Sequence, residues 1–174
     1  MKPIAVVVGN PKPASRTLGA AVEVANLLAK ATGAPANHLI VDLAEYASRL
    51  FDWNDAELSR LSAEVAAADL AVFASPTYKA SYTGMLKAFL DRYGSNGLAG
   101  TVAVPLMTGG WPGHLLAVEV HLRPVLVELG AVVPARGLYI TEPEFGELGK
   151  AVERWAATGV PPIQAALGVR PAEA

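Results

Sequence analysis

The chain has 174 residues, which suits one domain of ordinary size spanning residues 1–174. It has no cysteine, which excludes thiolate zinc sites, iron–sulfur clusters and a cysteine nucleophile. The net charge is −2 without any run of lysine or arginine, so the sequence carries no signal for nucleic-acid binding. Hydrophobic residues make up 52% and charged residues 17%, against about 25% charged in a typical domain, so we expect another subunit to cover part of the apolar surface.

Short apolar runs alternate with helical patterns along the chain. The runs predict strands at Ile4–Val8, His38–Val41, Leu70–Ala74 and Thr101–Met107, and a fifth, broken strand over Val132–Val133 and Gly137–Ile140. Apolar residues at helical spacing predict helices over 18–33, 57–68, 84–93 and 115–129. This alternation predicts a parallel sheet with helices on both faces, which is an open α/β sandwich.

Prolines modify this pattern at three places. Pro105 lacks a backbone donor, which weakens the prediction for the far end of the fourth strand. Pro124 is expected to kink or offset the last helix. The tail from Pro161-Pro162 onward, ending in residues 170–174, is expected to be a loose end or an arm that reaches a neighbour.

Three loops are the candidates for a functional site. In doubly wound sheets, ligands bind beyond the carboxyl ends of the strands, where the strand order reverses. The loops after the first, third and fourth strands are Gly9–Thr17, Ser75–Thr83 and Thr108–Gly113. All three concentrate glycine, proline, serine or threonine, so we expect a ligand where they meet.

The first loop has the features of an anion site. It leads into a helix N-terminus, where free backbone N–H groups and the helix dipole favour negative charge. Ser15 and Thr17 add hydroxyl groups, and Arg16 adds a guanidinium suited to phosphate. The loop matches neither a Walker A motif nor a dinucleotide fingerprint, so a terminal monophosphate fits better than a pyrophosphate. In the alternative interpretation, Ser15 only caps the helix and Arg16 is a solvated charge.

The second and third loops suit a flat ligand. Tyr78 and Tyr82 lie in a short segment before a helix, and exposed backbone beside an aromatic side chain favours a heteroaromatic ring. The glycines of the third loop let the main chain approach such a ring closely. The alternatives are tyrosines that pack on an adjacent subunit and a tight turn in which Trp111 is a packing residue.

No catalytic or metal constellation is evident in the sequence. His114 and His121 are seven residues apart on one predicted helix, about 10 Å, so they cannot share an ion. The acidic pairs Asp52 with Asp55 and Glu142 with Glu144 are interpreted as solvated loop charges. We therefore predict no catalytic side chain and no metal ligand, and we assign the difficult chemistry to a bound cofactor.

The loop segments resemble those of the NADPH-dependent FMN reductases of the flavodoxin-like superfamily, most closely the sulfonate-utilisation type that feeds reduced flavin to a separate monooxygenase. The similarity extends from the start of the chain to about Tyr139. The segments that carry it are Gly9-Asn10-Pro11, Pro13–Thr17, Ser75–Gly84 with Leu86-Lys87, Pro105–Gly110 and His114–Val118.

The resemblance implies a flavodoxin-like open sandwich with a five-stranded parallel sheet of order 2-1-3-4-5. It implies NAD(P)H-dependent reduction of FMN, with NADPH or NADH as donor, in a homotetramer or dimer that supplies a flavin-dependent monooxygenase. No apolar run approaches the ~18 residues of a membrane helix, and Ile4–Val8 is too short for a signal peptide. We therefore expect no membrane partner and a cytoplasmic location.

The resemblance also implies the FMN-binding residues, which come from all three loops. The resemblance implies that the first loop holds the FMN phosphate, that the second lies against the isoalloxazine, and that the third faces the ring from the other strand end. The residues are Asn10, Ser15, Arg16 and Thr17, then Pro76, Thr77, Tyr78 and Lys79, then Thr108, Gly109 and Gly110.

Two regions depart from the family pattern. Relatives can carry a tyrosine, associated with subunit packing and flavin release, where Val120 stands here, and the region after Ile140 matches no family pattern. Two alternative functions stay open from the sequence. One is a reductase that holds FMN and reduces quinones, azo dyes or metal ions directly, and the other is a flavodoxin-like electron carrier without nucleotide turnover.

Overall fold

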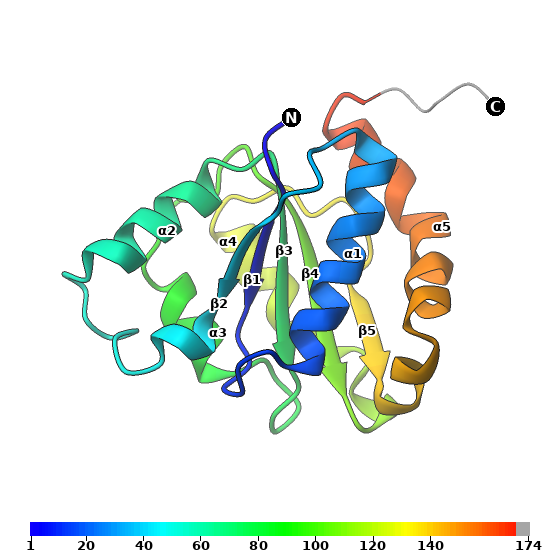
Figure 1. Cartoon of the computed structure of the whole chain (residues 1–174), viewed down its shortest axis with the longest axis horizontal. Coiled ribbons are helices and arrows are strands. Elements are labelled where there is room, and N and C mark those ends of the chain that lie inside the picture. Colours follow the sequence, from blue (N-terminus) through cyan, green and yellow to red (C-terminus); the bar gives the residue numbers. More distant parts are fainter. Residues whose placement is uncertain (170–174) are drawn as a thin grey trace.

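Five strands form one parallel sheet in the order β2-β1-β3-β4-β5 in the computed structural model, which describes residues 1–169 (Figure 1). The strands are β1 (Ala5–Val8), β2 (Leu39–Asp42), β3 (Leu70–Pro76), β4 (Val102–Gly109) and β5 (Leu138–Thr141). The helices are α1 (Arg16–Thr32), α2 (Ala56–Ala66), α3 (Gly84–Leu90), α4 (Arg123–Glu128) and α5 (Leu148–Ala166). The predicted flavodoxin-like class and strand order are confirmed.

Helices cover both faces of the sheet, which explains the continuous apolar runs of its central strands. Alternate side chains of β1 point to opposite faces. Ile4, Val6 and Val8 pack in a core with α1 and α5. Ala5 and Val7 pack in a second core with α2, α3 and the segment around α4. Figure 1 shows the two helix layers on either side of the strands.

Pro105 is accommodated inside β4, which extends to Gly109, beyond the predicted end at Met107. Ala103 N–H donates to Val132 O, so the odd-numbered residues of this part of β4 direct their nitrogens away from β3. The β5 ladder begins only at the pair Leu106–Leu138. Pro105 therefore lies where no neighbouring strand needs its missing donor.

The segment predicted as one helix over 115–129 is divided into two pieces and is preceded by a 3₁₀ turn. The 3₁₀ turn η2 (Pro112–His114) precedes the π-helix η3 (Val118–Leu122), and α4 follows with Pro124 in its first turn. Arg123 N–H donates to Val118 O, five residues back, which is the π-helical spacing. Because Pro124 has no N–H, it is tolerated only where a new helical segment begins. The predicted offset at Pro124 is thus confirmed.

The prediction of a loose tail from Pro161 onward is wrong, because α5 continues through both prolines to Ala166. Ile163 is fully buried in the core beside α1, and Gln164 Nε2 donates to Ala31 O at 2.7 Å. The carbonyls that Pro161 and Pro162 leave without helical donors belong to exposed positions that water can reach. Tertiary anchoring thus overrides the local cost of proline. The predicted arm over 170–174 lies outside the described residues.

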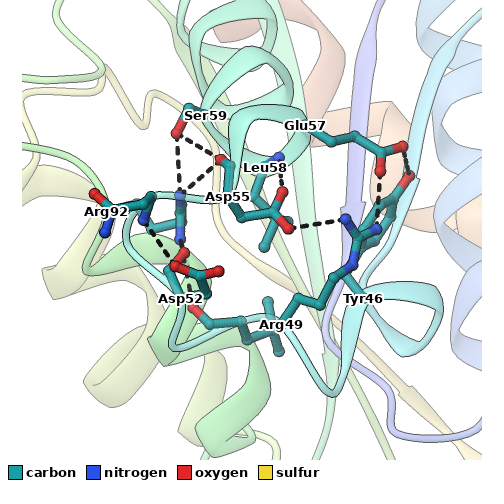
Figure 2. Close-up of polar contacts among 10 residues, drawn as sticks. Tyr46, Arg49, Asp52, Asp55, Glu57, Leu58, Ser59 and Arg92 are labelled. Carbon is teal, nitrogen blue, oxygen red and sulfur yellow. Dashed lines mark hydrogen bonds and ion pairs between the residues drawn. The ribbon is translucent and has the colours of Figure 1, made fainter.

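Two arginines hold the irregular segment between β2 and α2 (Figure 2). Arg49 forms ion pairs with Asp55 and Glu57, each at 2.8 Å. Arg92 donates to Asp52 O at 2.9 Å. Asp55 also caps α2 by accepting the Leu58 N–H at 2.8 Å. The interpretation of Asp55 as a solvated loop charge is therefore wrong: its side chain is 8% exposed and has a structural role.

In residues 1–169, no helix is both long and apolar enough to cross a bilayer.

Candidate functional site

A cavity of about 310 Å³ lies at the carboxyl ends of the strands, where the loops after β1, β3 and β4 meet the 3₁₀ helix η4 (Glu142–Glu147) that follows β5. These loops lie together at the lower edge of the sheet in Figure 1. The sequence-predicted residues that line the cavity are Asn10, Ser15, Arg16, Thr17, Pro76, Thr77, Tyr78, Thr108, Gly109 and Gly110. The lining residues that were not predicted are Lys12, Glu142 and Phe145.

The β1–α1 loop presents a helix N-terminus to the cavity. Ser15 is the N-cap of α1, and its Oγ accepts the Leu18 N–H at 3.2 Å. The other first-turn N–H groups have no partner within the helix. Asp42, at the end of β2, fixes the preceding turn by accepting the Ala14 N–H at 3.0 Å. Ser15 therefore does cap the helix, as in the alternative interpretation, while the first turn still offers donors to an anion.

Thr17 connects this loop to the centre of the sheet. Its hydroxyl accepts a hydrogen bond from Asn10 Nδ2 at 3.0 Å and lies 2.9 Å from Thr108 Oγ1. The residue is 2% exposed, so protein groups surround most of its surface. Asn10, Thr17 and Thr108 thus form one hydrogen-bonded unit in the floor between the first and third loops.

The loop after β3 forms a tight hairpin at the cavity. Tyr78 and Ser81 pair through two backbone hydrogen bonds, and the two residues between them, Lys79 and Ala80, have positive φ angles of 52° and 63°. Lys79 lies at the hairpin tip and is not among the residues that line the cavity. Tyr78 lines the cavity and is exposed. Tyr82, in contrast, packs against the core of its own chain.

Thr77 supplies an unsatisfied polar group at the cavity wall. Its backbone N–H donates to Thr108 O at 2.7 Å, which aligns the two loops. Its Oγ1 is buried and has no hydrogen-bond partner among residues 1–169. Thr77 lines the cavity, and buried hydroxyl groups are normally paired, so this unpaired hydroxyl makes Thr77 a candidate to bind a polar atom of a ligand.

Gly109, the last residue of β4, and Gly110, which follows it, are glycines for different structural reasons. A Cβ on Gly109 would lie 2.1 Å from Tyr139 Oη, so this position must be glycine for the phenol to reach Trp111 O. At Gly110, Glu142 Oε2 is the only atom of residues 1–169 that would lie within 4 Å of a Cβ, at 3.6 Å. The missing side chain of Gly110 therefore widens the cavity rather than relieving a clash. Trp111 is exposed and meets His114 edge to face.

Glu142 and Phe145 bring the segment after β5 into the site. Glu142 Oε1 accepts a hydrogen bond from Arg16 Nη2 at 2.9 Å, and the Arg16 guanidinium lies 5.1 Å from the centre of the Phe145 ring. Arg16 is thus neither simply solvated nor unpaired, and the interpretation of Glu142 as a solvated loop charge is incomplete. Its position directly after a strand that adjoins β4 is the sequence signal that identifies it.

The ion pair between Glu144 and Arg154 holds η4 in place. Burial alone would raise the pKa of Glu144, but hydrogen bonds from Thr141 N and Oγ1 to its Oε2 and from Arg154 to its Oε1 outweigh this, so the pKa lies below its usual range. Thr141 and Glu144 form a capping box. Glu144 therefore stays ionised and fixes the backbone that carries Glu142.

Comparison with known proteins identifies the family. The model of the family described as NADPH-dependent FMN reductase matches residues 2–144. The chain belongs to the NADPH-dependent FMN reductase family. It is 42% identical to the FMN reductase (NADPH) of Escherichia coli K12 over 82 residues, an aligned region that covers 47% of this chain and 43% of that protein. It is 35% identical to the NADH-dependent FMN reductase SfnF of Pseudomonas fluorescens Pf0-1 over 157 residues, which cover 84% of this chain and 80% of SfnF.

Solved structures of similar fold agree with this family. The chain superposes on an apo NADH:FMN oxidoreductase, EMOB, with a TM-score of 0.76, 28% identity and coverage of 88% of each chain. An oxidoreductase from Corynebacterium diphtheriae gives a TM-score of 0.82, 25% identity and coverage of 97% of each chain. The chain spans less than half the length of the three relatives named FMN reductase (NADPH).

The family implies FMN, and the residues of the cavity fit this group. Arg16, Ser15 and the first turn of α1 offer donors to a phosphate at one end. The unpaired Thr77 hydroxyl and the open wall at Gly110 suit a flat, polar-edged ring at the other end. A cavity of about 300–1,000 Å³ is typical of ligand sites, and this one lies at the lower limit.

Proposed function

We propose that the chain binds FMN in this cavity, catalyses its reduction by NADPH or NADH, and releases the reduced flavin to a partner monooxygenase. The observation that carries the proposal is the convergence of an anion-binding helix end with a guanidinium and a buried, unpaired hydroxyl in one cavity. The similarity to proteins named FMN reductase supports the reaction. The partner is proposed from the resemblance of the loops to the sulfonate-utilisation type.

At the phosphate end, each group has a distinct role in the proposal. Arg16 supplies a permanent positive charge, since a guanidinium stays protonated in proteins. The first-turn N–H groups of α1 and the Ser15 hydroxyl donate hydrogen bonds. Asn10 and Thr17 hold the loop against β4. We assign recognition of the phosphate to Ser15 and Arg16, and the preorganisation of the loop to Asn10 and Thr17.

At the ring end, the backbone does most of the work in the proposal. Pro76, Tyr78, Gly109 and Gly110 line the wall, and Thr77 Oγ1 supplies a hydrogen bond. When bound, FMN supplies the redox centre that accepts a hydride from the nicotinamide. The chain then orients two rings and excludes water between them, which needs no side chain as acid or base. Lys79 lies at the hairpin tip and does not line the cavity, so the proposal places its contact with the flavin at the edge of the site.

We also propose that the functional unit is a homo-oligomer, a dimer or a tetramer. Exposed apolar side chains are frequent in the sequence between residues 111 and 132, at Trp111, Leu115, Leu116, Val120, Val127 and Val132. Such a concentration favours a subunit contact. The low content of charged residues, 17%, supports the same conclusion.

Steady-state oxidation of NADPH and NADH, with FMN, FAD and riboflavin varied in turn, tests the reaction. The proposal expects oxidation above the rate of flavin without protein, with FMN preferred over riboflavin because only FMN engages Arg16. No oxidation above the flavin-only control with either nucleotide rejects the reductase function and favours an electron carrier.

Gel filtration after loading with FMN tests release. The proposal expects a colourless protein that turns over added FMN. A protein that stays yellow, and that reduces quinones, azo dyes or metal ions without added flavin, favours the alternative reductase that holds FMN.

A further inference from the structure

An acidic side chain from the segment after β5 enters the cavity that we assign to FMN. Glu142 lies 126 residues along the chain from Arg16, and its Oε1 accepts the hydrogen bond from Arg16 Nη2 at 2.9 Å. Its Oε2 lies 3.6 Å from the place that a Cβ on Gly110 would occupy. The carboxylate therefore lies between the arginine of the first loop and the backbone of the third loop, at the wall of the cavity.

The ion pair between Arg16 and Glu142 can separate easily, although the backbone that carries Glu142 is fixed. The capping box of Thr141 and Glu144 anchors the start of η4. The paired side chains themselves are 65% exposed at Arg16 and 59% exposed at Glu142. Exposed pairs are weak because water screens them and because ordering two long side chains costs entropy. An incoming anion can therefore displace the Glu142 carboxylate without disturbing the fold.

The guanidinium has a second support that does not depend on Glu142. Its carbon lies 5.1 Å from the centre of the Phe145 ring, within cation–π range. Phe145 also lines the cavity. Displacement of the carboxylate thus leaves Arg16 held beside the cavity by an uncharged neighbour.

We propose that Glu142 competes with the phosphate of FMN for Arg16 and so lowers the affinity for FMN relative to the uncharged flavin riboflavin. This inference rests on the proposed function. Carboxylate and phosphate seek the same donors of a guanidinium. If both stay at Arg16, like charges repel each other, and if Glu142 leaves, its ion pair is lost. Either cost applies to FMN and not to riboflavin. Glu142 thereby favours the exchange of FMN over its permanent retention.

Titration of flavin fluorescence with Glu142→Gln tests the competition. Gln keeps the size of the side chain and removes its charge. At low ionic strength we expect FMN to bind about 1.5- to 5-fold more tightly to the variant than to the wild type, from the size of exposed ion-pair and like-charge effects. Riboflavin affinity should not change, and the gain for FMN should shrink as salt is added.

Glu147→Gln is the matched control. Glu147 belongs to the same 3₁₀ helix, is exposed, pairs with Lys150 and does not line the cavity. The net charge changes by the same amount in both variants. Because Glu147 does not line the cavity, the FMN affinity of Glu147→Gln should equal that of the wild type. An equal gain in both variants, or no gain or a loss in Glu142→Gln, overturns the inference.

The same exchange in an Arg16→Ala background shows whether Glu142 acts through Arg16. We expect less than half of the fold-gain when the arginine is absent. An undiminished gain means general repulsion rather than competition and overturns the inference. If the wild type binds no FMN, both the inference and the proposed function are refuted. If it binds and reduces FMN but Glu142→Gln has no effect, only the inference is refuted.

Discussion

Arg16 combines the only side-chain charge in the first turn of α1 with a position on the wall of the cavity. Arg16→Ala should lower FMN affinity by about 1.5–3 kcal/mol, the usual contribution of a hydrogen bond to a charged group. That loss corresponds to about 10- to 150-fold. Riboflavin, which has no phosphate, should bind nearly as before. Titrations of both flavins check this, and equal losses would show that Arg16 does not contact the phosphate.

Gly9 is a residue whose side chain is excluded by a neighbouring helix rather than by a ligand. A Cβ at this position would lie 2.4 Å from Leu86 Cβ, so α3 would have to move. We expect Gly9→Ala to lower the free energy of unfolding by about 1–3 kcal/mol, as overpacking does. Urea denaturation measures the change.

Gly19→Ala is the control for that substitution. Gly19 lies in the interior of α1, is exposed, and has no atom within 4 Å of a Cβ. Alanine should therefore stabilise the protein by about 0.5–1 kcal/mol, because glycine is the poorer helix former. Destabilisation of similar size in both variants would contradict the steric explanation for Gly9.

At the scale of elements, the sequence was most informative where local pattern and tertiary environment agree. The β-branched run of β1 and the spacing that stops at Gly33, which has a φ of 74°, predicted β1 and α1 within two residues. The end of α5 was predicted to be a loose tail because Pro161-Pro162 is a strong local stop signal. Val152, Trp155, Gly159 and Ile163 nevertheless have helical spacing and are all buried. Their burial depends on α1, which local pattern does not encode.

Ile163→Ala tests whether the chain beyond the two prolines belongs to the fold. Because Ile163 is fully buried beside α1, we expect a loss of about 2–5 kcal/mol in the free energy of unfolding. Pro161 is exposed, and Pro161→Ala restores a helical donor, so this control should not destabilise. Denaturation curves of the two variants measure these changes. An Ile163→Ala variant with the wild-type free energy of unfolding would mean that the end of α5 is not anchored.

The cap of α2 gives a prediction about pH (Figure 2). The Leu58 N–H and, beyond it, Arg49 hold the pKa of Asp55 below its ordinary value, although partial burial opposes this. The carboxylate therefore stabilises the folded state above its unfolded pKa, about 3.9, and this contribution is lost as pH falls through the lower folded value.

Asp55→Asn keeps a capping oxygen but removes the titration. Its urea midpoint should be lower than that of the wild type near neutral pH, where the pair with Arg49 is lost. It should also fall less steeply below about pH 4. Parallel slopes for the two proteins in acid would show that Asp55 does not contribute to the acid sensitivity of the fold.

For the whole molecule, the cavity is assembled from four segments that are distant in the chain and adjacent only because of the strand order. The three loops after β1, β3 and β4 were predictable, since parallel strands end at one edge of the sheet. The contact of Glu142 with Arg16 was not, because it depends on how far η4 reaches over β4, which local sequence pattern does not encode. The site thus combines loops that the sheet topology places together with a helical segment whose reach depends on tertiary packing.

The exposed apolar side chains between residues 111 and 132 are the property of the whole molecule that local reasoning leaves unexplained. If they form a subunit contact, light scattering at micromolar concentration should give a mass of two or four chains. Leu116→Glu should lower that mass, because Leu116 is 56% exposed on this surface and a buried carboxylate there would be unpaired. Phe51→Glu changes an exposed apolar residue of the segment between β2 and α2 and should keep the wild-type mass. A monomeric mass for the wild type would contradict the proposed oligomer. If Leu116→Glu keeps the oligomeric mass of the wild type, the subunit contact lies on another surface.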